Sequence, residues 1–413
     1  MIRKLLFALS IFLCINGYAQ KIAVLEVELP VAANGIDIPV SVELDNITFE
    51  PASSLSLVEV KGAGRTPVTY QVEEGEQRLL HWLVKADGNQ SKKRVYELVK
   101  GQPPNATELK AGMDDGMLTI HKGNQNLLRY YYKTLEAPEG KNPAYRRSAF
   151  IHPLWTPHGQ ELTRIQPPDH AHHYGIWNPW THALFEKDTI DFWNIGDKKG
   201  TVRFANFTAV TDGAVYAQYD AVHEHVVFKK DGSEKVAMNE LQSVRVYNPG
   251  DSRDFFIVDM TMQMNCATSS PLLLLEYRYG GLGWRTTQEW DRNNSEVITS
   301  EGKTRKDADG SKATWCIVQG KLGDDYGGAL MMSYPTNYNH PEPLRIWPEN
   351  MYNRGDMFAN FDPTKDKDWL LEPGKKYVLK YRWIVFNGHF TKEKAAGAWK
   401  YFAMPPKVTV KKN

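Results

Sequence analysis

The sequence of 413 residues is poor in cysteine and carries no excess of either charge. It contains only 3 Cys, and its 50 Lys and Arg balance 49 Asp and Glu. No CxxC spacing occurs, which argues against a cysteine-ligated metal centre, and a disulfide-stapled miniprotein is excluded as well. Nucleic-acid binding is disfavoured because phosphate neutralisation needs clustered Lys and Arg, whereas basic and acidic residues are mixed here. We therefore expect neutral or weakly charged partners.

Several common catalytic motifs are also missing. The chain has no GxGxxG that opens a helix, no GxxxxGK[ST], no GxSxG and no HExxH. Dinucleotide-binding, nucleotide-binding, serine-hydrolase and zincin functions are accordingly weakly supported. We find no internal repeat, and helical periodicity is nearly absent.

Only the N-terminus has a long apolar run. Two basic residues precede Leu5–Ile15, and a small-x-small site ends at Ala19. This pattern predicts a signal peptide over residues 1–19, cleaved after Ala19, and a periplasmic or secreted protein. A lipoprotein attached through Cys14 is disfavoured because a bulky leucine precedes that cysteine. No later run reaches about 18 apolar residues, so no transmembrane segment is expected after cleavage.

Export affects how the remaining cysteines, Cys266 and Cys316, are interpreted. An oxidising compartment permits a disulfide between them. The alternative is a pair of buried free thiols in neighbouring strands.

The rest of the chain alternates polar and apolar residues with period 2, which is typical of β-strands. Residues 20–104 predict a small immunoglobulin-like β-sandwich, which ends near two prolines in the segment 101–105. Residues 105–413 predict a large antiparallel β-sandwich followed by one helix over Lys392–Phe402 with Thr391 as N-cap. The expected strands of this second domain are Val215–Phe228, Leu241–Tyr247, Phe255–Met264, Leu272–Tyr279, Ala329–Ser333 and Tyr377–Phe386.

The fold class is therefore all-β. We expect two large curved sheets packed face to face as a supersandwich, with one concave face open to a polar ligand. A double jelly roll is the alternative.

The densest cluster of reactive side chains is histidine-rich. Five of the 12 histidines lie within residues 152–173. His170 and His172, with Asp169, could ligate a divalent metal ion. Alternatively, His170 or His173 acts as general acid or base, because the ordinary imidazole pKa of about 6.5 lies near working pH. In a third interpretation these histidines only brace the loop by hydrogen bonds.

A second cluster follows four leucines. Glu276 and Arg278 would share one face of the expected strand, and a glycine-rich turn leads on to Arg285. Arg278 would keep Glu276 ionised, and Glu276 would serve as the carboxylate partner of His170 or His173. The alternative is a buried structural ion pair.

Tryptophans accumulate near both clusters. Trp faces pack on the apolar faces of sugar rings, so Trp155 and Trp177 are the expected stacking residues. Asn337 and His340 add polar groups that bind hydroxyls, although each of these side chains could equally be structural. The tryptophans near the motifs are Trp155, Trp177, Trp180, Trp193, Trp284, Trp290 and Trp347.

The stretches HPLWTPHG and PPDHAHHYGIW, followed at a distance by YRYGGLGWR, resemble the secreted bacterial family called methane oxygenase PmoA-like, otherwise a domain of unknown function. The resemblance covers roughly residues 110–400. It implies a β-rich secreted domain of the type found in glycan-degrading bacteria. Methane oxidation is not carried over, because the membrane methane monooxygenase subunit crosses the bilayer several times and this chain lacks such segments.

Together these features predict a secreted protein that acts on a carbohydrate or small polar substrate. His170 or His173 would transfer protons with Glu276, while Arg278 and Arg285 would hold anionic or hydroxyl groups. The reaction could be hydrolysis, elimination or epimerisation. The alternatives are a non-catalytic glycan-binding protein and a metal-dependent hydrolase or oxidase.

Overall fold

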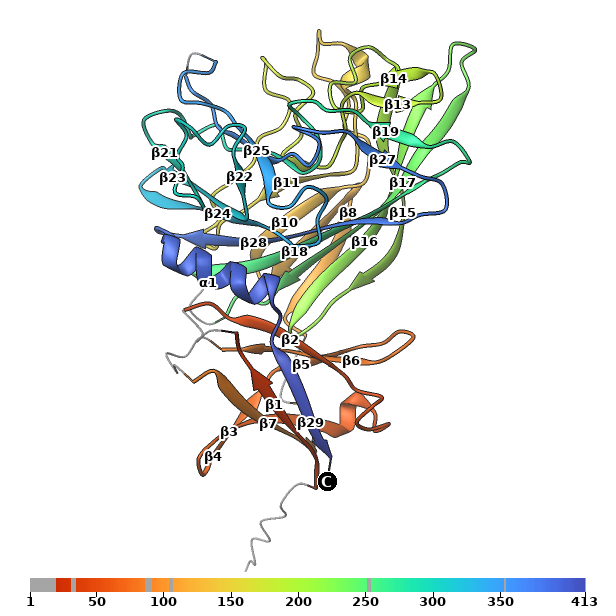
Figure 1. Cartoon of the computed structure of the whole chain (residues 1–413). Helices are drawn as coiled ribbons and strands as arrows, with labels where there is room; N and C mark the ends of the chain where they lie inside the picture. The colour runs from red at the N-terminus through yellow and green to blue at the C-terminus, as the bar shows by residue number, and fades with distance from the viewer. Residues whose placement is uncertain are drawn as a thin grey trace, which may run out of the picture.

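The computed structural model describes residues 20–30, 35–85, 91–103, 107–250, 254–352 and 354–412. The predicted signal peptide 1–19 lies outside the described residues, as do positions 104–106 at the predicted domain boundary. Antiparallel strands dominate the described chain, and one α-helix lies near its C-terminus. The all-β sandwich prediction is confirmed (Figure 1).

The small sandwich at the bottom of Figure 1 has two sheets. Their strand orders are β29-β1-β7-β3-β4 and β2-β6-β5. Its elements are β1 (Lys21–Glu28), β2 (Ile38–Glu43), η1 (Ala52–Ser54), β3 (Leu55–Lys61), β4 (Gly64–Val68), β5 (Tyr70–Glu73), β6 (Leu79–Val84), β7 (Lys93–Lys100) and β29 (Lys407–Lys412).

The last strand differs from the predicted domain division. β29 pairs with β1, from Ala23 opposite Lys412 to Glu28 opposite Lys407. Val408 and Val410 pack against the core of the small sandwich. The end of the chain, predicted to belong to the large domain, therefore completes the first one.

The large sandwich consists of an eight-stranded sheet facing a nine-stranded sheet, and one hydrophobic core includes residues of both. The eight-stranded sheet has the order β15 (Gly200–Thr211), β16 (Tyr216–Phe228), β17 (Glu234–Tyr247), β18 (Phe255–Cys266), β28 (Tyr377–Asn387), β24 (Asp325–Ser333), β23 (Trp315–Leu322) and β21 (Ser295–Thr299). The nine-stranded sheet has the order β22 (Lys312–Ala313), β25 (Glu342–Ile346), β26 (Phe358–Phe361), β20 (Gly283–Arg285), β12 (Ile176–Trp177), β11 (Phe150–Leu154), β10 (Gln125–Tyr131), β9 (Met117–Lys122) and β8 (Leu109–Asp114). A four-stranded sheet adds β14 (Asp188–Ile190), β13 (Ala183–Phe185), β19 (Leu272–Leu274) and β27 (Trp369–Leu371), and η2 (Pro143–Tyr145) precedes β11.

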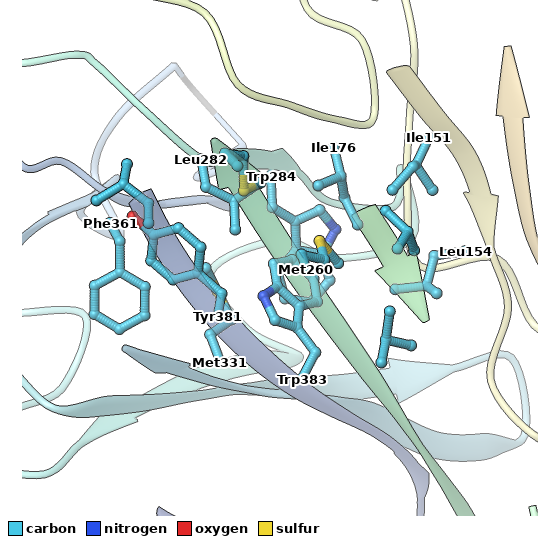
Figure 2. Close-up of a cluster of buried hydrophobic side chains, with 14 of the residues drawn as sticks. Ile151, Leu154, Ile176, Met260, Leu282, Trp284, Met331, Phe361, Tyr381 and Trp383 are labelled. Carbon is cyan, nitrogen blue, oxygen red and sulfur yellow. The ribbon is translucent and has the colours of Figure 1, made fainter. Parts of the chain in front are cut away.

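Alternation along β18 explains how the two large sheets pack. Met260, Met262 and Met264 are fully buried, whereas the residues between them are partly exposed. Figure 2 shows Met260 with Trp284 and Trp383 in the core between the sheets. The ring centroids of Trp284 and Trp383 lie 5.1 Å apart. Because Trp284 belongs to β20, this core supports the strand that carries Arg285.

The predicted C-terminal helix is present in the structure. α1 spans Lys392–Ala403, and the Thr391 hydroxyl accepts a hydrogen bond from the Lys394 N–H as an N-cap. Buried residues of α1 pack with side chains of the eight-stranded sheet and with Ile36 and Leu83 of the small sandwich. Among the described residues, no helix is long and apolar enough to cross a membrane.

The two cysteines are buried free thiols, so the disulfide alternative is wrong. Cys266 ends β18 and Cys316 lies on β23. Strands β28 and β24 separate these two strands within the sheet, so they are not the neighbouring strands that we expected. Burial raises the pKa of the Cys316 thiol well above its ordinary value.

Candidate functional site

The histidine-rich motif forms a closed loop between two paired backbone segments. We call residues 166–175 the histidine loop. The Gln166 N–H donates to the His173 carbonyl at 2.8 Å, and the Arg285 N–H donates to the Gly175 carbonyl at 2.8 Å. Gly175 has a φ of +57°, and a Cβ there would lie 2.2 Å from the Ile151 carbonyl oxygen. The loop is therefore held against β11 and β20 by contacts that require glycine at this position.

Asp169 and His170 form a hydrogen-bonded pair at the tip of this loop. His170 Nδ1 lies 2.8 Å from Asp169 Oδ2. The side chains are 12% exposed for His170 and 41% exposed for Asp169. Arg285 Nη2 lies 3.8 Å from the same carboxylate oxygen. An imidazole held by a carboxylate on one nitrogen can exchange a proton through the other.

The protonation states of the pair follow from their surroundings. Burial lowers the pKa of His170, and the hydrogen bond and charge of Asp169 oppose this shift only in part. Burial raises the pKa of Asp169, but the hydrogen bond with His170 and the charge of Arg285 outweigh it, so the pKa is lowered. At neutral pH His170 is therefore neutral and Asp169 is ionised. Nδ1–H then donates to Asp169, which leaves Nε2 as a proton acceptor.

His173 lies beneath this pair and is sealed from solvent. Its residue exposure is 1%, and its ring centroid lies 4.7 Å from that of His170. The walls around it include Trp177 and Phe358. Burial lowers the pKa of His173 well below its ordinary value, and its Nδ1 has no partner within the described chain. His173 therefore packs against His170 and is closed off from solvent.

Aromatic side chains from a distant segment line one side of His170. The centroid of Trp347 lies 5.0 Å from the His170 ring, and that of Tyr352 lies 4.6 Å away. Tyr352 is 45% exposed, and the Trp347 Nε1–H donates to the Tyr279 hydroxyl at 3.1 Å. The exposed Tyr352 ring can contact an apolar sugar face.

Asp356 organises the charges behind this wall. Its Oδ2 lies 2.6 Å from Arg285 Nη2 and 3.4 Å from Arg164 Nη1, and its Oδ1 lies 3.5 Å from Arg354 Nε. Three guanidinium groups thus share one carboxylate, which leaves local positive charge near Asp169. Arg285 also lies over the Trp347 ring at 4.6 Å. Sequence reasoning found Arg285, but no local motif marked Asp356, Arg164 or Tyr352.

The predicted partnership of Glu276 is not formed. β19 ends at Leu274, so Glu276 and Arg278 do not share a strand face, and both are exposed. The Glu276 N–H donates to Asp368 at 2.6 Å, and its carboxylate makes no ion pair among the described residues. Arg278 lies over the rings of its two neighbouring tyrosines instead. The carboxylate that contacts His170 is Asp169.

The predicted stacking residues also lie apart from a common surface. Trp177 is 0% exposed and packs on His173, so it cannot contact a sugar as it stands. Trp155 is half-buried, with the Arg129 guanidinium 5.4 Å from its ring centroid. Neither ring is in contact with His170, whose ring contacts include Trp347 and Tyr352.

Asn337 and His340 belong to a different, largely buried network. The Asn337 amide donates to Glu342 Oε1 at 2.7 Å and to the Lys380 carbonyl at 2.9 Å. The His340 ring stacks on Trp399. Burial raises the pKa of Glu342 to about 7. Asn337 is 5% exposed, so its amide is committed to the fold and is not offered to a ligand.

We expect Asn337→Ala to destabilise the protein by about 1–3 kcal/mol, because it removes a donor from the buried Glu342 carboxyl group. Urea unfolding measures the loss. Thr336→Ala, an exposed substitution in the same loop, should stay within about 0.5 kcal/mol of the wild type. Equal stability of both variants would show that the buried network contributes nothing.

The expected metal ligands are not arranged as a set. Asp169 is occupied by His170, and the ring centroids of His170 and His172 lie 5.6 Å apart. Burial lowers the pKa of His172 to about 4. Within the described ranges, no group of three or more His, Cys, Asp or Glu side chains could hold a metal ion.

Comparison with known proteins adds a family but no activity. No curated protein matches the chain. A family model described as "Family of unknown function (DUF6807)" matches residues 117–400, which include the histidine loop, Arg285 and Asp356. This match spans more than half of the 413 residues. The chain therefore belongs to this family of unknown function.

Proposed function

We propose that this protein is exported and acts on a carbohydrate or small polar substrate beside the His170–Asp169 pair. The observation that carries the proposal is the 2.8 Å contact between His170 Nδ1 and Asp169 Oδ2, next to the exposed ring of Tyr352. This pair replaces the expected partnership of His170 with Glu276. We keep the relationship to PmoA-like proteins as a proposal, and we do not propose that this protein oxidises methane.

In this proposal neutral His170 accepts a proton through Nε2, from water in a hydrolysis or from a substrate carbon in an elimination or epimerisation. Asp169 stabilises the imidazolium that forms, and the imidazolium then gives the proton to the departing oxygen or, in an epimerisation, back to the carbon. Arg285, paired with Asp356, lies beside Asp169 and keeps its carboxylate ionised, while Tyr352 contacts the sugar ring. Hydrolysis, elimination and epimerisation all use such a proton transfer.

Non-catalytic glycan binding is the second candidate, and the position of Glu276 favours it. Glycoside hydrolysis ordinarily uses two carboxyl groups across the scissile bond. Glu276 was expected to be the carboxylate partner of His170 or His173, but its hydrogen bond in the described structure is to Asp368. The same aromatic and arginine side chains would then bind a sugar without turnover.

Incubation with a panel of polysaccharides and oligosaccharides, followed by mass spectrometry, separates the two candidates. Catalysis predicts new products from the wild type and almost none from His170→Gln. Retention of one polysaccharide by both proteins, with no product after prolonged incubation, would support binding alone. Absence of both product and retention across the panel would contradict both candidates.

A further inference from the structure

A cavity lies beside the beginning of β15, and no residue of the histidine loop lines it. It has a volume of about 580 Å³ and is lined by η2, by the segment around Lys198 and by the first residues of β15. Ligand pockets typically measure about 300–1,000 Å³, so this cavity has room for a small molecule. Positive side chains contribute several of its walls, namely Arg146, Arg147, Lys198 and Arg203.

Arg147 is the unusual member of this group. It is 1% exposed, and its Nη1–H donates to the Phe192 carbonyl at 3.0 Å. Its Nε and Nη2 have no hydrogen-bond partner, and no carboxylate lies within ion-pair distance of it, in the part of the chain that the structure describes. Arg203, in contrast, contacts Glu224 at 2.9 Å and Glu234 at 2.6 Å.

A buried guanidinium without a direct ion pair is unfavourable because its charge has lost water, and the carboxylates of Glu240 and Asp191 act on Arg147 only from beyond ion-pair distance. Burial lowers the pKa of Arg147 to about 10, which still leaves the group protonated at neutral pH. Nε and Nη2 form one edge of the planar guanidinium. Two parallel N–H groups on such an edge match two oxygens of a carboxylate, sulfate or phosphate.

We propose that this cavity binds an oxyanion group through the Nε and Nη2 edge of Arg147, carried by a ligand of about monosaccharide size. The cavity also offers Lys198, an exposed cation without an ion pair among the described residues, at its edge. The site contains neither His170 nor Asp169, so this proposal does not depend on the proposed function.

Isothermal titration calorimetry on the full chain tests this site with sodium sulfate, galactose 6-sulfate, galacturonate and uncharged galactose at constant ionic strength in chloride. We expect saturable binding of the charged probes and none of galactose. Tenfold tighter binding of galactose 6-sulfate than of sulfate would support a sugar-borne oxyanion, whereas equal affinities would overturn the monosaccharide-sized ligand and leave a site for the free ion. Binding of galactose as tight as that of the charged sugars, or no binding of any oxyanion, would overturn the proposal.

Substitutions at two residues of the cavity test whether the oxyanion binds there. Arg147→Lys keeps the charge but removes the two-pronged edge, so we expect at least tenfold weaker binding. Because a substitution at a buried arginine can impair folding, Ala144 provides a second probe on the partly exposed wall of the same cavity. Ala144→Glu should weaken oxyanion binding at least tenfold, whereas its neutral counterpart Ala144→Gln should bind like the wild type. Equal affinities of the Glu and Gln variants would overturn the assignment.

Discussion

The His170→Gln variant is expected to turn over substrate about 10²–10⁴-fold more slowly than the wild type, which is the range for removal of a general acid or base. Glutamine can still accept a hydrogen bond but cannot carry a proton between substrate groups. Rates of product formation on the substrate found in the polysaccharide screen measure the effect. His170 is largely buried, so circular dichroism and thermal unfolding must confirm that the variant is folded.

A second histidine–carboxylate pair provides the matched control. His158 Nδ1 lies 2.5 Å from Asp325 Oδ2, and the His158 side chain is 53% exposed. It lies outside the histidine loop, and its hydrogen-bond partners, Asp325 and Asn387, are not among the residues around His170. His158→Gln should therefore retain wild-type turnover. A comparable loss in both variants, or an undiminished rate in His170→Gln, would contradict the role assigned to His170.

The pH profile distinguishes a chemical role of Asp169 from a structural one. Burial lowers the pKa of His170, and the hydrogen bond and charge of Asp169 raise it again in part. Asp169→Asn removes the charge, so the pKa of His170 should fall further. The neutral base would then persist to lower pH, and the acidic limb of kcat/KM should move to lower pH while the maximal rate decreases. NMR titration of the His170 ring gives the same shift without a substrate, and an upward shift would contradict the geometry.

Strand and helix positions could be predicted where local pattern and packing agree. Predicted strands Val215–Phe228 and Phe255–Met264 correspond to β16 and β18 because alternate residues face the sandwich core. The capping residue Thr391 likewise fixed the start of α1. β29 was missed because its short, lysine-rich sequence becomes a strand only by pairing with β1 at the other end of the chain.

The site shows a similar division between local and long-range information. The loop carrying Asp169 and His170 could be recognised because its reactive residues are consecutive in the sequence. Asp356 and Tyr352 come from a distant segment that tertiary packing brings to the loop, and no local pattern marks them. Glu276 and Arg278 were expected on one strand face because four leucines suggested a longer strand, whereas β19 ends at Leu274.

The largest stability effect is expected at Glu240, which lies inside the large sandwich with 0% exposure. Its Oε2 lies 3.1 Å from His225 Nε2 and accepts a hydrogen bond from the Asn178 amide at 3.0 Å. Removing one partner of a buried charged network costs about 3–5 kcal/mol, since the remaining polar groups stay buried without partners. Glu240→Ala should therefore lose about that much unfolding free energy at pH 7, measured by urea denaturation.

The free energy of unfolding should fall in acid as the Glu240 carboxylate becomes protonated. Burial raises the pKa of Glu240, but the contacts with His223 and His225 outweigh it and hold the pKa at about 2, below the ordinary 4.5. The stabilisation is thus present above pH 4.5 and lost as the pH falls towards 2. Between pH 5 and 3.5 the wild type should lose about 1 kcal/mol more than Glu240→Gln, which has no ionisable group there.

A neighbouring glutamate shows whether these effects require burial. Glu224 lies between His223 and His225 on β16, but its side chain is 27% exposed and pairs with Arg203 at 2.9 Å. Partly exposed ion pairs contribute about 0–1 kcal/mol, because water already solvates the charges. Glu224→Gln should accordingly cost less than about 1 kcal/mol. If both glutamates cost the same, or if Glu240→Ala is as stable as the wild type, burial of the Glu240 network does not contribute the expected stability.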